Sequence, residues 1–400
     1  MAQAFPEIKK RFGFGAMRLP MKDGKIDTDQ VNEMVDVFIE NGFNYFDTAH
    51  GYHDGLSELT LRQCLTSRHS RDEYLLTNKL SEEYFKSEES IRPFFESQLE
   101  ACGVDYFDFY LMHAQDRRNY VKYQNCHAYE VAAALKKEGK IRHIGISFHD
   151  TADILDGILT DHPEVEIVQI QFNYLDYDDH AIQSGKCLEI CAKHGKPAIV
   201  MEPVKGGSLA NLPEEAAKVF ADLGPMSPAS YAIRYVAGFD QVAMILSGMS
   251  SLEQMKDNIS FMKDFQPLSE TEHQAVAKVK EIFKGMNLIP CTNCHYCVEE
   301  NHCPKDILIP DMFACLNAKK MFNDWNQRVY YRNELTQNGH GKASDCLKCG
   351  KCEKVCPQHL EIRKLSSGHR TGKGQFSYQT QRKAMPKNAQ TTTQFHSSHT

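Results

Sequence analysis

Short apolar runs rich in β-branched and aromatic residues alternate with amphipathic stretches of helical period between residue 28 and about residue 285. This alternation is typical of repeated strand–helix units, whose strands lie parallel in one sheet. A further run of this kind precedes residue 28, which gives eight expected strands: 12–20, 44–49, 73–80, 106–113, 140–147, 165–173, 196–203 and 241–248. Helices are expected at 28–42, 90–103, 128–140 and 180–195, and three of the four close on a glycine suited to a helix C-terminus.

Polar residues stand at the ends of three successive expected strands, Asp47, Lys79 and His113. They are 32 and 34 residues apart, a nearly constant step of one strand–helix unit. A TIM barrel gives such a step and collects its active site at the C-terminal ends of its strands. We therefore predict an α/β fold, a (β/α)8 TIM barrel. An open doubly wound sheet is the alternative, but Gly13 and Gly15 lack the third glycine of the dinucleotide-binding fingerprint and precede no clear helix.

Three segments carry candidate catalytic side chains: FDTAHGYHDG with Asp47 and Tyr52, LLTNKL with Lys79, and LMHAQ with His113. In this order and at these strand ends, they resemble the aldo-keto reductase family, and the resemblance covers the whole barrel region. It implies a nicotinamide cofactor, NADP or NAD, bound in extended form without a Rossmann domain. It also implies a small-molecule carbonyl or alcohol substrate.

The chemistry of carbonyl reduction explains why these residue types would be needed. Hydride transfer leaves negative charge on the carbonyl oxygen, so the site needs an acid aimed at that oxygen. Tyr52 is the candidate acid, and the Lys79 ammonium is expected to lower its pKa from the ordinary value of about 10. Asp47 would pair with Lys79, because a buried ammonium without a partner would lose its proton, and His113 would orient the carbonyl. The alternative for these four residues is a buried polar network that only stabilises the barrel.

Later segments resemble those that hold the nicotinamide end of the cofactor in the family. Ser147 and Gln169 stand where the family binds the carboxamide, although Phe148 replaces the asparagine frequent beside the serine. Met201 stands where many members stack a tyrosine on the nicotinamide. The pyrophosphate-loop positions are Pro203, Val204, Gly206, Gly207 and Leu209.

The segment SGMSSLEQMKDN resembles the one that grips the adenosine end, through Gly248, Ser250, Gln254 and Asn258. Members that hold a 2′-phosphate tightly tend to carry Lys and Arg where Gly248 and Gln254 stand. The preference for NADP over NAD is therefore expected only because it is the usual one in the family.

Eight of the 14 cysteines fall in two tight runs, CTNCHYCVEENHCP and CLKCGKCEKVCP. The second has the spacing C-x2-C-x2-C-x3-C-P of bacterial ferredoxins, whereas the first has five residues before its last cysteine. By resemblance to ferredoxins, the runs would hold two [4Fe–4S] clusters, the fourth cysteine of each run crossing to the other cluster. Zinc is the alternative, but three cysteines at successive x2 intervals ending in Cys-Pro favour iron. The implied ligand sets are Cys291, Cys294 and Cys297 with Cys356, and Cys346, Cys349 and Cys352 with Cys303.

A change of composition marks the expected domain boundary. Paired cysteines and short polar links replace the strand–helix pattern after MNLIP, and the chain turns polar and irregular from about residue 370. We expect a barrel over 1–285, a small ferredoxin-like iron–sulfur domain over 286–370 and a disordered tail over 371–400.

Charge and apolar patterning limit the expected partners and compartment. The formal net charge is -7 and no lysine-rich or arginine-rich block occurs, so neither nucleic acid nor an anionic membrane is expected as a partner. No run approaches the roughly eighteen apolar residues of a membrane span, and the N-terminus lacks the apolar stretch of a signal peptide. Cysteines grouped in two tight runs, in a chain that is not a small secreted domain, also favour bound metal over disulfides. Bound metal of this kind indicates a reducing compartment. A cytoplasmic protein is expected.

The two parts of the chain handle electrons in different numbers. A hydride carries two electrons and a cluster exchanges one at a time, and no flavin fingerprint links them. The clusters could exchange electrons with the barrel substrate, serve an electron-transfer partner protein, or only stabilise their domain. We predict a nicotinamide-dependent oxidoreductase of the aldo-keto reductase type with iron–sulfur clusters for one-electron transfer. A non-catalytic nicotinamide-binding redox sensor or electron-transfer protein is the alternative.

Overall fold

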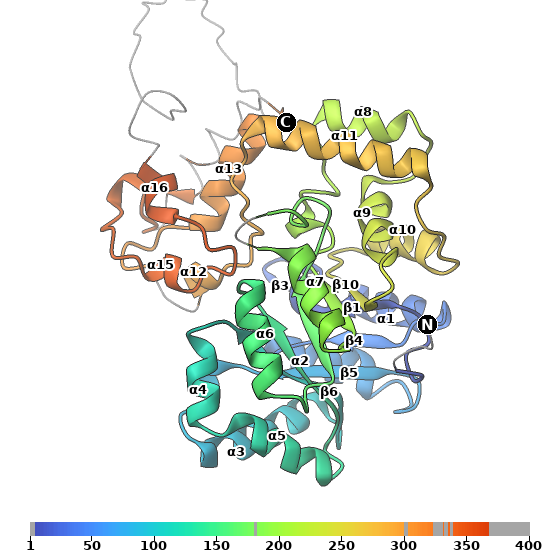
Figure 1. Ribbon diagram of the computed structural model, residues 1–400, viewed down its shortest axis with the longest axis vertical. Helices are drawn as coiled ribbons and strands as arrows, with labels where there is room; N and C mark the ends of the chain where they lie inside the picture. The colour runs from blue at the N-terminus through green and yellow to red at the C-terminus, as the bar shows by residue number, and fades with distance from the viewer. Residues whose placement is uncertain are drawn as a thin grey trace, which may run out of the picture.

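The computed structural model describes residues 5–179, 182–299, 303–322, 331, 335–336 and 339–367. Eight parallel strands close into a barrel in chain order, with the first strand paired to the last (Figure 1). The predicted TIM barrel is confirmed. Its strands are β1 (Phe12–Gly15), β4 (Tyr45–Asp47), β5 (Leu75–Leu80), β6 (Phe107–Gln115), β7 (Ile141–Phe148), β8 (Ile167–Gln171), β9 (Ala198–Met201) and β10 (Val242–Ser247).

The four predicted helices are present as α1 (Thr28–Glu40), α3 (Glu88–Cys102), α5 (Ala128–Lys137) and α7 (Ser184–Lys193). Local signals fix their ends, as α3 shows: Ser87 caps its first turn, and Gly103 ends it at a φ of 66°, which glycine adopts without strain. Residues 180–181, the predicted start of the fourth helix, lie outside the described residues. The other helices of this part are α2 (Leu56–Leu61), α4 (Asn119–Asn125), α6 (Ala152–Asp161), α8 (Glu214–Ala221), α9 (Pro228–Ala237), α10 (Leu252–Met262) and α11 (Glu270–Met286).

The first predicted strand is shorter than expected. β1 ends at Gly15, because Ala16–Arg18 turn into a 3-10 helix, and a small antiparallel hairpin follows as β2 (Met21–Lys22) and β3 (Lys25–Ile26). A Cβ atom on Gly13 would lie 2.8 Å from Leu246 and 3.0 Å from Tyr45. Gly13 is thus required for packing inside the barrel rather than for a phosphate-binding turn.

Apolar side chains fill the barrel interior below its C-terminal rim. They form one buried cluster. This packing leaves the C-terminal ends of the strands as the place for a site. The cluster contains Phe5, Ile8, Tyr45, Leu75, Phe109, Leu111, Ile167, Ile199, Met244 and Leu246.

The cysteine-rich part forms a second, smaller core after α11 (Figure 1). Ile289, Ile307, Met312 and Phe313 are buried in it, and cysteines of both runs pack against them. Among its described residues, the helices are α12 (Tyr296–Glu299), α13 (Ile309–Phe322), α15 (Lys351–Lys354) and α16 (Ile362–Ser367). The tail predicted as disordered, 371–400, lies outside the described residues. No helix within the described ranges is both long and apolar enough to cross a membrane.

Candidate active site and cysteine centres

Lys79 is the centre of the candidate catalytic group at the barrel rim. It stands near the end of β5 with 1% of its side chain exposed. Its Nζ donates to Asp47 Oδ1 at 2.6 Å, to the Thr48 carbonyl at 2.8 Å and to the Tyr52 hydroxyl oxygen at 3.3 Å. The structure therefore brings the predicted acid, ammonium and carboxylate into one hydrogen-bonded group.

His113, in β6, joins this group from the next strand. Its Nδ1 lies 2.6 Å from the Ser81 hydroxyl, and its ring lies edge-on to Tyr52 with 6.3 Å between ring centroids. Burial, with the Lys79 charge adding to it, holds the pKa of His113 well below its usual value. The ring is therefore neutral near pH 7 and suited to orienting a carbonyl rather than to carrying charge.

The electrostatics of Tyr52 differ from the sequence-based expectation. Burial raises the pKa of Tyr52 above its ordinary value, and the Lys79 ammonium opposes burial without outweighing it. Burial also acts to lower the pKa of Lys79, but the Asp47 carboxylate and the Tyr52 oxygen outweigh burial and raise it. The predicted lowering of the Tyr52 pKa is wrong, because desolvation of a phenolate costs more than one ammonium returns. Tyr52 keeps its proton at neutral pH, as an acid must.

Both parts of the chain line the pocket above Tyr52. On the barrel side the pocket is bordered by Asp47, Tyr52 and His113. On the opposite side it is bordered by residues of the two cysteine runs or next to them, Thr292, Cys294, Tyr296, Pro357 and Gln358. The cysteine-rich part therefore closes over the mouth of the barrel.

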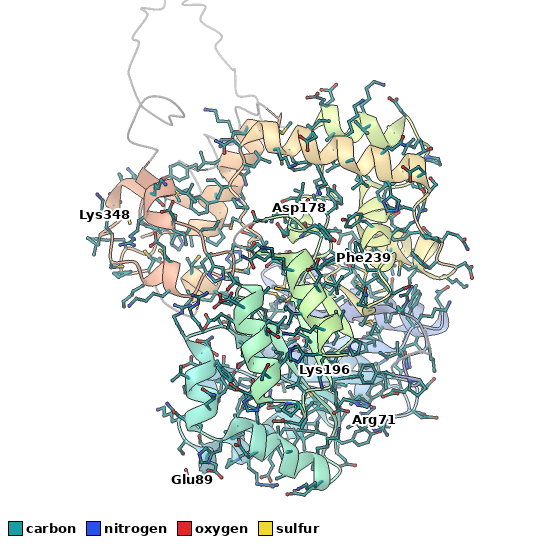
Figure 2. All side chains as sticks on the ribbon, viewed as in Figure 1. Arg71, Glu89, Asp178, Lys196, Phe239 and Lys348 are labelled. Atoms are coloured by element: carbon teal, nitrogen blue, oxygen red, sulfur yellow. The ribbon has the colours of Figure 1, made fainter. Side chains whose placement is uncertain are left out.

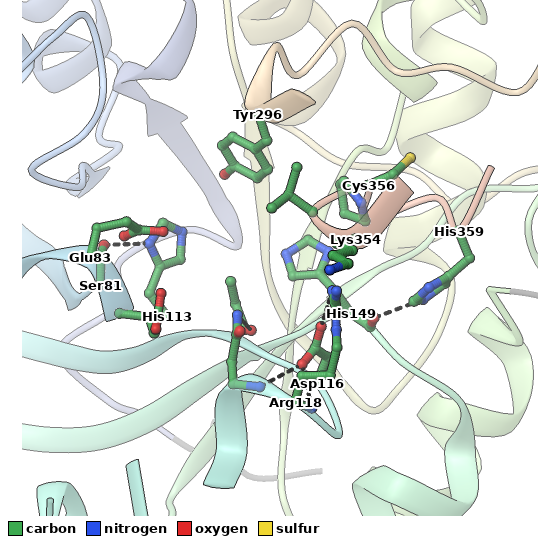
Figure 3. A pocket seen from close by; sticks show the side chains of 15 residues that line it. Ser81, Glu83, His113, Asp116, Arg118, His149, Tyr296, Lys354, Cys356 and His359 are labelled. Carbon is green, nitrogen blue, oxygen red and sulfur yellow. Dashed lines mark hydrogen bonds and ion pairs between the residues drawn. The ribbon is translucent and has the colours of Figure 1, made fainter. Parts of the chain in front are cut away.

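A second pocket also borders His113 and reaches the same cysteine-rich part (Figure 3). His149 and Arg118 border it from the barrel, and Tyr296 and Cys356 from the opposite side. His113, His149, Tyr296 and Pro357 are common to both pockets, so the two spaces meet there. Neither His149 nor Tyr296 was predicted as a site residue. Tyr296 stands inside the first cysteine run and His149 two residues after Ser147, and these neighbours were the available signal.

The predicted nicotinamide-end residues gather at the Tyr52 pocket. Ser147, Gln169 and Met201 all border it, and so does Gly248, which was predicted at the adenosine end. The Ser147 hydroxyl accepts from the Ala114 amide at 2.8 Å. A buried hydroxyl and a buried carboxamide side by side fit a nicotinamide carboxamide, which both donates and accepts hydrogen bonds.

Other predicted cofactor contacts lie farther from this pocket. Leu209 is fully buried in a core with α8 and α11, where it is not available to a ligand. Asn258 is 5% exposed and donates to Ser247 Oγ at 3.2 Å. The remaining loop positions are covered to different degrees: Pro203 is buried, and Val204, Gly206 and Gly207 are half-buried. Ser250 and Gln254, predicted at the adenosine end, lie near the surface. There the Ser250 amide donates to Gln254 Oε1 at 2.8 Å.

The eight cysteines of the two runs form two groups, which we call the proximal set (Cys291, Cys294, Cys297 and Cys356) and the distal set (Cys303, Cys346, Cys349 and Cys352). Burial and the neighbouring Cys356 and Cys291 thiols raise the pKa of Cys294. Two members of the proximal set, Cys294 and Cys356, border the pockets described above. The proximal set is therefore the one beside the candidate catalytic group.

The distal set surrounds a small cavity of its own, which all four of its cysteines border. Burial raises the pKa of Cys352 to about 12, and Glu353 and the other three thiols of the set act in the same direction. Cys349 is exposed, and the adjacent Lys348 lies at the outer edge of the cysteine-rich part (Figure 2). The distal set thus faces the surface.

The donor chemistry of both sets suits iron–sulfur clusters. Within the described ranges, no three His, Cys, Asp or Glu side chains converge closely enough to hold a single metal ion. Four cysteine thiolates are the ligand set of a [4Fe–4S] cluster. The four cysteines of the distal set border one cavity and are backed by an apolar core.

Acidification gives a test of the buried histidine between the pockets. Burial, with His359 adding to it, lowers the pKa of His149 to about 4. The unfolded chain then binds more protons than the folded one between about pH 6.5 and 4, so stability falls as the pH falls through this window. We expect the thermal midpoint of the native protein to drop more steeply there than that of His149→Asn. His273→Asn, at an exposed position in α11, is the control and should keep the native slope. Parallel slopes for the native protein and His149→Asn would contradict the assignment.

Comparisons with known proteins agree with both parts of this description. The Aldo/keto reductase family model matches residues 11–281, and the model of a 4Fe-4S dicluster domain matches 290–361. The chain is 26% identical over 297 residues to the NADH-specific methylglyoxal reductase of Escherichia coli, covering 62% of this chain and 89% of that one. It is 25% identical over 292 residues to the L-galactose dehydrogenase of Arabidopsis thaliana, covering 68% and 90%.

Solved structures show the same fold. The holo form of aldo-keto reductase AKR11C1 from Bacillus halodurans superposes with a TM-score of 0.55 at 25% identity, covering 67% of this chain and 91% of that one. An aldo-keto reductase from Klebsiella pneumoniae in complex with NADPH gives a TM-score of 0.56 at 21% identity, covering 68% and 90%.

Proposed function

This chain belongs to the aldo/keto reductase family, with a 4Fe–4S dicluster domain after its barrel, and we propose that it transfers hydride between NAD(P)H and a small carbonyl or alcohol substrate. The observation that carries the proposal is Lys79 Nζ, which bonds both the Asp47 carboxylate and the Tyr52 hydroxyl at the wall of a pocket. A purely structural network would not need a phenol aimed at that space.

In this proposal each of the four side chains has a separate task. The nicotinamide, when bound, supplies a hydride to the carbonyl carbon. Tyr52 donates its proton to the carbonyl oxygen, which is why a raised pKa is compatible with its role in reduction. Lys79 stabilises the phenolate that remains, and Asp47 keeps Lys79 charged and in place. His113, neutral and held by Ser81, orients the carbonyl.

We propose that Ser147 and Gln169 hold the nicotinamide carboxamide and that Met201 packs against the ring. All three border the pocket that contains Tyr52. Pro203, Val204, Gly206 and Gly207 of the loop 203–209 would hold the pyrophosphate. Gly248, Ser250 and Gln254 would hold the adenosine end. Neither Gly248 nor Gln254 supplies a cation for a 2′-phosphate, so NADH and NADPH both belong in the assays.

The dicluster domain would use the proximal and distal sets as ligands of two clusters. Protein prepared without oxygen is then expected to be brown, to contain about eight iron atoms per chain and to bleach with dithionite. Iron and zinc analysis of the same sample measures this. Stoichiometric zinc without iron would contradict the assignment, and about four iron atoms would leave only one of the two sets as a cluster site.

The proposed division of the chain follows the sequence-based one, with a barrel over 1–285, an iron–sulfur domain over 286–370 and a tail over 371–400. We propose a cytoplasmic location, because cluster-binding thiolates persist in a reducing compartment. An electron-transfer protein is the proposed partner of the clusters.

Turnover measurements test the function directly. NADH or NADPH oxidation should match alcohol formation one to one across a panel of aldehydes, ketones and dicarbonyls, with at least one compound turned over. A nicotinamide-binding redox sensor would instead bind NAD(P)H, detected by its fluorescence, and turn over none of them.

A further inference from the structure

A chain of four buried polar side chains links the proposed pyrophosphate loop to the iron–sulfur domain. Lys205 Nζ lies 2.5 Å from Asp176 Oδ1, and Asp176 Oδ2 accepts from Gln171 Nε2 at 2.9 Å. Gln171 and Gln358 then bond reciprocally through their amides, at 2.9 and 2.7 Å. None of the four is more than 6% exposed, so water cannot readily substitute for any of these bonds. We call these residues the polar chain.

The ends of the polar chain lie at two different binding regions. Lys205 belongs to the loop 203–209, beside Gly206. Gln358 is two residues from Cys356, a member of the proximal set, and borders the Tyr52 pocket together with Cys294. A change at either end therefore acts on the same buried hydrogen bonds.

A second contact joins the same two regions. A Cβ atom on Gly206 would lie 2.3 Å from the Thr292 carbonyl oxygen, so the loop touches the backbone of the first cysteine run. Arg18 Nη2 donates to that carbonyl at 2.9 Å and lies 3.7 Å from Glu202 Oε1, while Glu202 accepts from the Gly206 amide. A shift of the loop toward Thr292 would press on the segment that carries the proximal set.

We propose that the polar chain couples dinucleotide binding at the barrel to reduction of the cluster held by the proximal set. The dinucleotide diphosphate competes with Asp176 for the Lys205 ammonium, and Asp176 orients Gln171. Reduction adds one negative charge next to Gln358, at the other end. Because a coupling free energy is reciprocal, bound dinucleotide makes this cluster harder to reduce, and the reduced protein binds dinucleotide more weakly.

The coupling rests on the proposed function in one respect, the location of the dinucleotide site. Lys205 would meet the diphosphate itself, whereas Asp176, Gln171 and Gln358 are positioning residues, since their side chains act through one another. Their effect is therefore sought in a potential rather than in turnover alone.

The test is a potentiometric titration of the intact protein, followed by electron paramagnetic resonance, with and without saturating NADP+ and then NAD+. One of the two cluster midpoints is expected to fall, by about 59 mV for each tenfold difference in dinucleotide affinity between the oxidised and reduced protein. Couplings of this kind are typically about 5-fold to 150-fold. The midpoint of the distal cluster should stay in place.

Gln358→Ala removes the amide that hydrogen-bonds Gln171 at the cluster end of the polar chain. The remaining midpoint shift should correspond to less than about a twofold difference in dinucleotide affinity between the oxidised and reduced protein. The iron content should be unchanged. Asp176→Asn is a second variant, remote from the cysteines, that weakens the bond to Lys205 at the loop end. Gln274→Ala is the matched control, because Gln274 is exposed and its side chain donates to Glu270 on its own helix. It should keep the native shift.

Several results would overturn the inference. Dinucleotide binding, seen as a change in NAD(P)H fluorescence, without any change in either midpoint would overturn the coupling and leave the proposed function intact. A native-sized shift in both Gln358→Ala and Asp176→Asn would exclude the polar chain as its carrier. Absence of dinucleotide binding would overturn both the coupling and the proposed function.

Discussion

Tyr52→Phe is expected to lower kcat for carbonyl reduction by at least about 100-fold, the usual loss when general acid catalysis is removed. The ring remains, so its edge-on contact with His113 and its position over Lys79 are kept. Only the hydroxyl that accepts from Lys79 Nζ is lost. Steady-state rates with the best substrate found, together with fluorescence titration of NAD(P)H, measure the effect.

The dinucleotide affinity of this variant should change little, because the phenol acts on the substrate oxygen rather than on the cofactor. Tyr235→Phe is the matched control: Tyr235 lies in α9, packs on Phe239 and borders neither pocket. It should retain native turnover. If Tyr52→Phe turned over as fast as the native protein, the assignment of the acid would be wrong.

Lys79→Met is expected to abolish turnover and to destabilise the barrel by about 3–5 kcal/mol, the usual cost of breaking a buried ion pair by removing one partner. Methionine keeps the length and apolar stem of the side chain but leaves the Asp47 carboxylate, itself 4% exposed, without its cation. Urea denaturation followed by circular dichroism measures the loss of stability.

Two further variants show whether the uncompensated charge is the cause. Lys218→Met removes a lysine from a pair with Asp222 that is exposed on both sides, and should change stability little. Combining Lys79→Met with Asp47→Asn removes the unpaired carboxylate, so it should regain much of the lost stability without regaining activity. Equal destabilisation by Lys79→Met and Lys218→Met would argue against a buried catalytic ion pair.

Much of the barrel was predictable because its signals are local. Strand and helix periods, and caps such as Ser87 and Gly103, depend on residues a few positions apart. The constant step between Asp47, Lys79 and His113 then placed them on neighbouring strands, and parallel strands bring such residues to one rim.

The pKa of Tyr52 was not predictable in the same way. The motif places an ammonium nearby, but it does not say how much water is excluded from the phenol. Burial outweighs the charge of Lys79, and burial is a property of the assembled rim and of the domain that covers it. The prediction that the Tyr52 pKa is lowered was therefore wrong, because the tertiary structure sets the direction of this shift.

Spacings along the chain were enough to predict the barrel, the catalytic residue types and the two cysteine runs. The closure of the iron–sulfur part over the barrel mouth, with Gln358 hydrogen-bonded to Gln171, 187 residues earlier, is visible only in the folded chain. No periodicity connects such residues. Their contact depends on how two separately packed cores dock, which is set by shape and by buried polar partners that must find each other across the interface.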